Sequence, residues 1–96
     1  MLLKNEVYKI VSKIPKGKVK TYGEIAKLVG TSPRAVGQIL HKNKNPKKVP
    51  CHRVVFANGS LSKNYAFGGI KKQKELLLNE KIKFSKGKAL LRNSNL

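Results

Sequence analysis

The sequence predicts a mainly α fold: a small helical domain with a helix-turn-helix and short β-hairpin segments. Its 96 residues are enough for one domain with one modest core. In several stretches, apolar residues recur at the spacing of three and four that marks one face of a helix. Pro, Gly, Ser and Thr stand between these stretches, where they typically begin and end helices. We therefore expect residues 1–96 to form a single domain.

The first helix is predicted from about Asn5 to Ile14. Its apolar positions follow an i, i+3, i+4, i+7 pattern and are Val7, Ile10, Val11 and Ile14. Pro15 and Gly17 come directly afterwards and are expected to end the helix.

A second helix is predicted to begin after Thr21, because Thr21 and Glu24 have the spacing of a capping box. Its buried face is expected to carry Ile25, Ala26, Leu28 and Val29. Gly30 is the expected C-terminal cap, because glycine adopts the left-handed backbone conformation without strain.

Ser32 and Pro33 predict the start of a third helix, as its N-cap and its first residue. The expected inward positions are Ala35, Val36, Ile39 and Leu40, and the outward ones are Arg34, Gln38, His41 and Lys42. Two short helices joined by residues 29–32, the second of them basic, predict a helix-turn-helix. Gly37 lies mid-helix, where glycine costs about 1 kcal/mol relative to alanine. Either a neighbouring helix or another backbone, such as that of DNA, is expected to approach it closely.

The second half of the chain gives weaker signals. Residues 43–48 are polar and basic and are expected to form a loop. Residues 53–61, with a turn at 58–59, predict a short β-hairpin. Residues 64–69 contain two glycines and are expected to form a loop, followed by a fourth helix at about 70–79. The tail shows one short alternation of apolar and polar residues.

The charge balance points to a polyanionic partner. The chain has 22 Lys and Arg against 4 Asp and Glu, a net charge of +18. Such an excess is expected to attract nucleic acid and to make that binding salt-dependent. A Lys-rich genome or a heat-adapted host is an alternative, given 19 Lys against 3 Arg. That bias would explain the choice of Lys over Arg, but it leaves the scarcity of acidic residues unexplained.

A membrane is the less favoured partner. No long helix is predicted to carry an apolar face opposite a basic one. No apolar run approaches the roughly 20 residues that a membrane span needs, and the opening residues are too few for a secretory signal. We therefore expect a cytoplasmic protein.

Cys51 is the only cysteine and stands in the segment V-P-C-H-R-V. It cannot form an internal disulfide, and no Cys/His cluster has zinc spacing, so no metal is expected. A cysteine is nucleophilic only as thiolate, so its free pKa of about 8.5 must be lowered by a nearby base or positive charge. His52 follows directly, but neighbours on an extended segment point to opposite faces, so a bridging water or a turn at Pro50 would be needed. A buried, inert cysteine beside a surface histidine explains these residues about equally well.

Four segments of the chain resemble, in order, the C-terminal domain of the O6-alkylguanine-DNA alkyltransferases, or methylated-DNA–protein-cysteine methyltransferases. They read IPKGKVKTYGEIAKLVG, PRAVGQIL, PCHRVV and NYAFGGIKKQKELLLNE, and the resemblance runs from about Val7 to Glu80. P-C-H-R-V is highly specific for this family. The resemblance implies a winged helix-turn-helix domain that binds double-stranded DNA containing O6-alkylguanine in the minor groove. It further implies that the damaged base is flipped out and that its alkyl group passes irreversibly to the cysteine. No cofactor is implied, and a monomer is expected.

The resemblance also implies roles for individual residues of the reaction site. Cys51 would accept the alkyl group, and His52 would deprotonate it through a water. Glu80 would orient the imidazole of His52, and Tyr65 would donate a hydrogen bond to the flipped guanine. Asn43 and Arg53 would support the turn around the cysteine.

Four further residues are implied to contact DNA. Arg34 would fill the gap left by the flipped base, and Tyr22 would press on the phosphate and assist the rotation. Ala35 and Gly37 would keep the recognition helix slim enough for the narrow minor groove. Taken singly, these residues and those of the reaction site have ordinary structural explanations as core, helix-surface, ion-pair or loop residues.

The sequence departs from the family in three places. Most members carry an additional N-terminal domain, whereas only a few residues precede the first predicted helix here. The turn before Pro33 looks shorter than in many members. Ala66 and Phe67 follow Tyr65, where relatives often have Ser or a larger residue.

Two other functions compete with alkyl transfer. Alkyltransferase-like proteins are short, share this domain and bind alkylated DNA as non-enzymatic sensors. They commonly replace the cysteine with tryptophan, whereas this chain has Cys51 and no Trp. A helix-turn-helix regulator would read sequence in the major groove and would leave P-C-H-R-V without a role. The retained cysteine therefore favours the enzyme.

Overall fold

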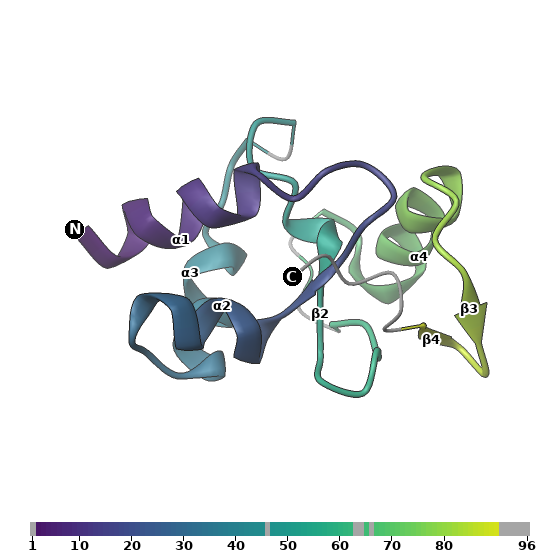
Figure 1. The fold of residues 1–96 in the computed structure, drawn as a ribbon. Helices are drawn as coiled ribbons and strands as arrows, with labels where there is room; N and C mark the ends of the chain where they lie inside the picture. Colours follow the sequence, from purple (N-terminus) through teal and green to yellow (C-terminus); the bar gives the residue numbers. More distant parts are fainter. Residues whose placement is uncertain (1, 46, 63–64, 66, 91–96) are drawn as a thin grey trace.

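Helices dominate the computed structural model, which describes residues 2–45, 47–62, 65 and 67–90. The helices are α1 (Leu2–Ser12), α2 (Tyr22–Val29), α3 (Pro33–His41), the short 3-10 helix η1 (Cys51–Arg53) and α4 (Gly69–Asn79). The strands are β1 (Lys20–Thr21), β2 (Val54–Val55), β3 (Phe84–Ser85) and β4 (Lys88–Ala89) (Figure 1). The predicted mainly α class is confirmed. No helix within the described ranges is long and apolar enough to cross a membrane.

The predicted caps of α2 and α3 are present. The side chain of Thr21 accepts the N–H of Glu24 at 3.0 Å, and the Glu24 carboxylate accepts the N–H of Thr21 at 2.8 Å. Gly30 ends α2 in the left-handed conformation, with φ 77°. Ser32 caps α3 by accepting the N–H of Ala35 at 3.1 Å. These caps satisfy backbone N–H groups that a helix start leaves unpaired, and they fix the turn between the two helices.

The apolar core has two parts that meet at a short parallel sheet. β1 pairs with β2, so that Lys20 lies opposite Val54 and Thr21 opposite Val55. Val54 belongs to the part formed with α1, α2 and α3. Val55 belongs to the part formed with α4 and the β3–β4 hairpin. Successive side chains of a strand point to opposite faces, so β2 joins the two parts and holds η1, which precedes it, between them (Figure 1).

Two predictions about the helices are wrong in detail. α1 ends at Ser12, and Ile14 is buried beyond the helix end. Ile14 precedes Pro15, and a residue before proline is disfavoured in the helical region. Leu28 is predicted to lie on the buried face of α2, but its side chain is 63% exposed. Only a narrow face of this short helix, with Tyr22, Ile25 and Ala26, packs on the core.

The predicted position of the β-hairpin is also wrong. The turn near residues 58–59 exists, since the N–H of Gly59 donates to the carbonyl of Phe56 at 2.8 Å. β2, however, pairs with the distant β1. The hairpin lies in the tail, where β3 pairs with β4 in antiparallel register. Lys86 and Gly87 form its turn with φ 54° and φ 81°, and positive φ at both central residues is typical of tight hairpins. The loop predicted at 64–69 lies partly outside the described residues, and Ala66 is one of the residues that are not described.

Candidate active site

The segment around Cys51 forms a tight turn instead of an extended strand. The N–H of Cys51 donates to the carbonyl of Val49 at 2.7 Å, and the N–H of Arg53 donates to that of Pro50 at 3.0 Å. In a 3-10 helix, successive side chains point in directions about a third of a turn apart. Among the described residues, no hydrogen bond joins the side chains of Cys51 and His52, which are both buried.

Asn43 holds the thiol from the loop that follows α3. Its amide nitrogen donates to the carbonyl of Val49 at 2.8 Å and lies 3.5 Å from the Sγ of Cys51. Its carbonyl oxygen accepts the N–H of Asn45 at 3.1 Å. Burial raises the pKa of the Cys51 thiol, and the Asn43 hydrogen bond opposes this rise without cancelling it. The expected lowering of this pKa is therefore not found, because desolvation of the thiolate outweighs the donors around it.

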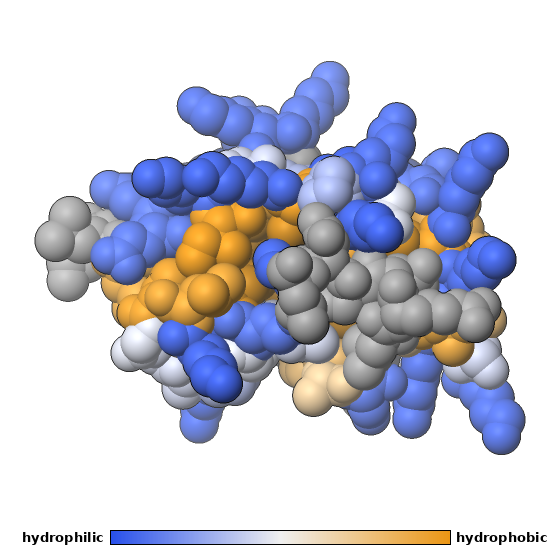
Figure 2. All heavy atoms as spheres, viewed as in Figure 1, coloured by the Kyte–Doolittle hydropathy of each residue, from blue (hydrophilic) through white to orange (hydrophobic). Residues whose placement is uncertain are grey.

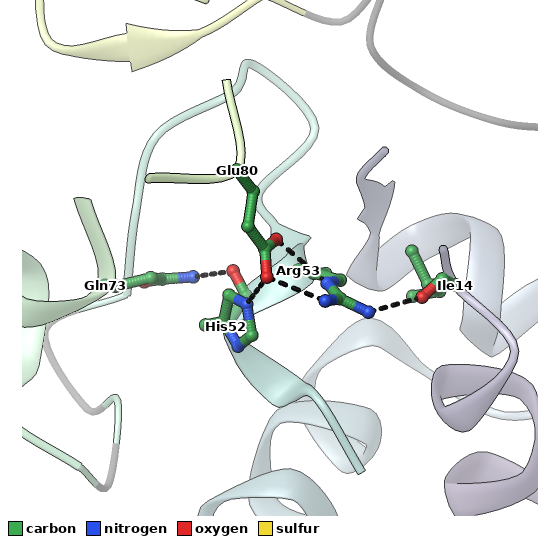
Figure 3. A network of polar contacts seen from close by, with 5 residues as sticks. All are labelled: Ile14, His52, Arg53, Gln73 and Glu80. Carbon is green, nitrogen blue, oxygen red and sulfur yellow. Dashed lines mark hydrogen bonds and ion pairs between the residues drawn. The ribbon is translucent and has the colours of Figure 1, made fainter. Parts of the chain in front are cut away.

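Behind the thiol, His52, Arg53 and Glu80 form a polar network (Figure 3). His52 Nε2 lies 3.0 Å from Glu80 Oε2. Arg53 grips the same carboxylate with two donors, Nε at 2.9 Å and Nη2 at 2.7 Å. Its third donor, Nη1, reaches the carbonyl of Ile14 at 2.7 Å. A paired Arg–carboxylate contact is rigid, so the position of Glu80 against the imidazole is fixed.

Burial favours a neutral imidazole at His52, although the neighbouring Glu80 carboxylate favours the charged form. Burial would raise the pKa of Glu80, but hydrogen bonds from Arg53 and His52 outweigh it and lower the pKa. Burial lowers the pKa of His52, Glu80 opposes this, and the charge of Arg53 adds to the lowering. An ionised Glu80 accepts the proton of Nε2, which leaves Nδ1 of His52 as the nitrogen that can take up a proton.

Gln73 in the middle of α4 belongs to the same network and was missed in the sequence (Figure 3). It has no exposed surface. Its amide nitrogen donates to the carbonyls of His52 and Val54, each at 3.0 Å, and its oxygen accepts the N–H of Ser62 at 3.1 Å. Gln73 thus ties η1 and β2 to the helix that ends at Glu80. The available signal was its position four residues before the buried Leu77, on the same helical face.

A hollow of about 940 Å³ opens at Cys51. It is lined from α2, α3 and the segment after β2 by Tyr22, Pro33, Arg34, Gly37, Gln38, Leu40, His41, Lys42, Cys51, Phe56, Ser62 and Tyr65. Four of the predicted site residues therefore line the same hollow as Cys51. Three come from the helix-turn-helix and one from the loop before α4: Tyr22, Arg34, Gly37 and Tyr65. His52, Arg53 and Glu80 do not line this hollow.

Tyr65 lines this hollow and has an unpaired hydroxyl. Its Oη is buried and has no hydrogen-bond partner among the described residues. Burial, with added effects of the charges of Cys51 and Glu80, raises its pKa to about 12. The phenol therefore keeps its proton at neutral pH and can donate it to a bound group. An unpaired buried hydroxyl is costly, which is typical of a site that a ligand completes.

The predicted DNA-contact residues differ in exposure. Arg34 is exposed on α3, whereas Tyr22 is only 9% exposed and packs against Phe56, with ring centroids 5.1 Å apart. Ala35 is half-buried and does not line the hollow. A Cβ added at Gly37 would meet only the Tyr22 ring, at an ordinary 3.9 Å. Neighbouring helices therefore do not require glycine there.

The described residues contain no cluster of side chains that could bind a metal ion. Across residues 2–45, 47–62, 65 and 67–90, no group of three or more His, Cys, Asp or Glu side chains could hold an ion. The site is instead a thiol, an imidazole–carboxylate pair and a phenol.

Comparison with known proteins assigns this architecture to one family. Residues 3–82 match the family described as "6-O-methylguanine DNA methyltransferase, DNA binding domain". The methylated-DNA–protein-cysteine methyltransferase of Methanocaldococcus jannaschii is 46% identical over 77 residues, which cover 80% of this chain and 44% of that protein. Its counterpart in Saccharolobus solfataricus is 58% identical over 53 residues, covering 55% of this chain and 35% of that protein. The chain thus spans less than half the length of these curated relatives.

Solved structures give the same assignment. S. pombe Atl1, in complex with damaged DNA containing O6-carboxymethylguanine, is similar with a TM-score of 0.77 and 38% identity. That similarity covers 94% of this chain and 88% of Atl1. The O6-methylguanine DNA methyltransferase of Methanococcus jannaschii is similar with a TM-score of 0.67 and 46% identity, covering 83% of this chain and 46% of that one.

Proposed function

We propose that this chain, which belongs to the 6-O-methylguanine DNA methyltransferase family through that family's DNA-binding domain, transfers alkyl groups irreversibly from O6-alkylguanine in double-stranded DNA to Cys51. One observation carries the proposal. Cys51, the exposed Arg34 and Tyr65, whose buried hydroxyl is unpaired, line one hollow. A nucleophile, a donor for a leaving group and a cation at the entrance are the parts that such a transfer needs.

The DNA-binding step uses α3. Its outward face carries Arg34 and the Cβ-free surface of Gly37, and Ala35 adds a second small side chain. A slim, basic helix suits the minor groove, which is narrower than the major groove. Arg34 takes the place of the extruded guanine, Tyr22 guides the rotating nucleotide from the wall of the hollow, and the base enters beside Cys51. Base flipping is required because the O6 substituent is out of reach inside the duplex. The proposed functional unit is a monomer.

Alkyl transfer then proceeds as a displacement at carbon. His52 takes the thiol proton through a water, and its new positive charge is balanced by Glu80 at 3.0 Å. The Sγ of Cys51 forms a bond to the alkyl carbon while the bond from that carbon to O6 breaks. The electron pair of the broken bond stays on the guanine, which gains overall the proton that the thiol lost. The thioether is stable, so each chain reacts once.

Tyr65 assists the departure of guanine. Charge develops on the base as the C–O6 bond breaks, and a donor already placed in the hollow stabilises that charge. Its hydroxyl has no other partner among the described residues, so binding the base satisfies a buried donor as well. Asn43 and Arg53 act indirectly. Asn43 holds the turn that contains Cys51, and Arg53 holds the carboxylate of Glu80.

A non-enzymatic sensor is the second candidate function, and the similarity to Atl1 favours it. This chain covers 88% of that protein, compared with less than half of the curated methyltransferases. Burial also raises the pKa of the Cys51 thiol, as would suit a binding pocket that does no chemistry. The sensor would retain the lesion in the hollow and leave it intact.

The fate of the lesion separates the two functions. The protein is mixed with a duplex that carries one O6-methylguanine, and the remaining O6-methylguanine is quantified after digestion of the DNA. The enzyme removes lesions up to a plateau of one per chain, and Cys51→Ser removes none. Tight, lesion-selective binding with every lesion intact would instead establish the sensor.

A further inference from the structure

A second hollow, of about 560 Å³, lies between α1 and the loop that follows α3. Its lining contains five lysines and no acidic residue: Lys4, Lys9, Lys42, Lys44 and Lys48. Asn5, Tyr8, Ser12, Asn43 and Asn45 add polar groups to the same surface. The reaction proposed above uses Asn43 as a brace and leaves the other residues of this hollow without a role.

The hollow is formed by ordered contacts. Lys4 Nζ lies over the ring of Tyr8, 5.6 Å from its centroid. The loop is closed by Asn45, whose side chain accepts the N–H of Lys48 at 3.2 Å and whose carbonyl accepts the N–H of Val49 at 2.9 Å. Five like charges around one depression repel one another unless an anion lies between them. The surface therefore fits a ligand with several negative charges.

The position of the hollow identifies this ligand. Lys42, which follows the last residue of α3, lines both hollows, so the basic hollow adjoins the site of Cys51 at the C-terminal end of α3. A duplex that receives α3 in its minor groove carries a phosphate backbone past the end of that helix. Phosphate is also the group that lysines bind in DNA complexes.

We propose that this basic hollow binds phosphates of the DNA backbone outside the flipped nucleotide. The inference rests on the DNA binding proposed above, but it does not depend on alkyl transfer. Phosphate contacts carry no sequence or lesion information. The hollow therefore strengthens binding to damaged and undamaged duplexes equally, and it steepens the salt dependence by about 0.9 in log–log slope for each phosphate bound.

The test compares two triple variants of equal net charge. One replaces Lys9, Lys44 and Lys48 with Gln, and all three side chains are exposed. The control replaces Lys71, Lys86 and Lys88, which are exposed on α4 and the β3–β4 hairpin, at the other end of the molecule in Figure 1. The affinity for an undamaged duplex is measured over a range of salt concentrations, and melting temperatures check that each variant folds.

We expect the slope of log affinity against log salt to become shallower by about 2 to 3 in the Lys9/Lys44/Lys48 variant, and by less than about 1 in the control. The ratio of affinities for damaged and undamaged duplexes stays that of the unchanged protein. Equal slopes in the two variants would overturn the inference. Binding of both variants to anionic phosphatidylserine vesicles is measured as well. A Lys9/Lys44/Lys48 variant that binds vesicles more weakly but binds the duplex as the control does would also overturn the inference. A wild-type chain that left every lesion intact, while the two slopes still differed, would refute alkyl transfer and support the phosphate site.

Discussion

At the scale of single residues, burial keeps the thiol of Cys51 neutral. Burial raises the pKa of Cys51 and lowers that of His52, so thiol and imidazole are both uncharged at neutral pH. In the proposed reaction, this neutral pair exchanges a proton through the bridging water once the lesion has entered the hollow. For the single-use cysteine proposed here, a neutral thiol would limit reactions with other electrophiles, because the thiolate is the reactive form.

The pH dependence of alkyl transfer follows from these shifts. The pKa of His52 is lowered, so the imidazole stays neutral below its ordinary pKa of about 6.5. The rate with a free O6-alkylguanine base should be flat through neutral pH and fall only under more acidic conditions, as His52 is protonated. Stopped assays over a pH series measure this. A log rate that instead rises with pH at a slope of one, and levels off only above the ordinary thiol pKa of about 8.5, would mean that unassisted ionisation of the thiol limits the reaction.

Tyr65→Phe separates chemistry from folding. The variant removes a hydroxyl that has no hydrogen-bond partner among the described residues, so stability should be unchanged or slightly higher. The rate of alkyl transfer should fall about 10-fold or more, because a preplaced donor to the leaving group is lost. Chemical denaturation and single-turnover kinetics measure the two effects. A clear loss of stability without a loss of rate would assign Tyr65 to the core.

Residue roles could be predicted only where the family motif contains them. The proximity of His52 and Glu80 was expected from the resemblance, and the two side chains lie 3.0 Å apart; their catalytic roles stay predictions. Gln73 was missed because its three partners come from segments distant in sequence. The raised pKa of Cys51 was missed because the sequence shows the neighbouring charges but not the burial that outweighs them.

At the scale of elements, local signals predicted the helices better than the strands. The capping box of α2 and the Ser-Pro start of α3 involve residues three positions apart, so they are visible in the sequence. The pairing of β1 with β2 joins segments more than thirty residues apart, and no local pattern encodes it. The actual hairpin, β3–β4, has a Lys-Gly turn that is weaker than the Asn-Gly signal found near residue 58.

Gly37→Ala tests the exposed face of α3. The new Cβ meets only the Tyr22 ring at 3.9 Å, so alanine should stabilise the helix by about 1 kcal/mol. DNA affinity should fall, because a methyl group would stand where the minor groove is proposed to close on the helix. Gly23→Ala in α2 is the matched control, since its Cβ also has room and Gly23 does not line the hollow. Equal DNA affinity of the two variants would contradict the proposed orientation of α3.

Gln73→Leu tests the internal tie between α4 and the reaction site. The substitution leaves the carbonyls of His52 and Val54 and the N–H of Ser62 buried without this partner. We expect a loss of about 3 kcal/mol in the free energy of unfolding, measured by urea denaturation. Gln38→Leu, on the exposed face of α3, should change stability by less than about 0.5 kcal/mol. Similarly small changes in the free energy of unfolding of both variants would show that the hydrogen bonds of Gln73 contribute little to stability.

At the scale of the whole molecule, the two-part core places Cys51 where the proposed DNA recognition and the proposed chemistry meet. The part with α1, α2 and α3 carries the helix-turn-helix, and the part with α4 supplies Glu80 and Gln73. β2, which directly follows η1, contributes Val54 to the first part and Val55 to the second. The net charge of +18 suits a molecule that meets DNA over a wide area, and hydrophilic side chains project from much of the face in Figure 2.

The central claim is that Cys51 itself carries the alkyl group after the reaction. The most direct measurement is the mass of the peptide that contains Cys51, after incubation of the protein with a duplex bearing one O6-methylguanine. We predict that one methyl group replaces the thiol hydrogen in that peptide, to a limit of one per chain. An undamaged duplex, or the Cys51→Ala variant, should give no gain in mass. An unmodified Cys51 peptide from protein that remains tightly bound to the lesion would contradict the account.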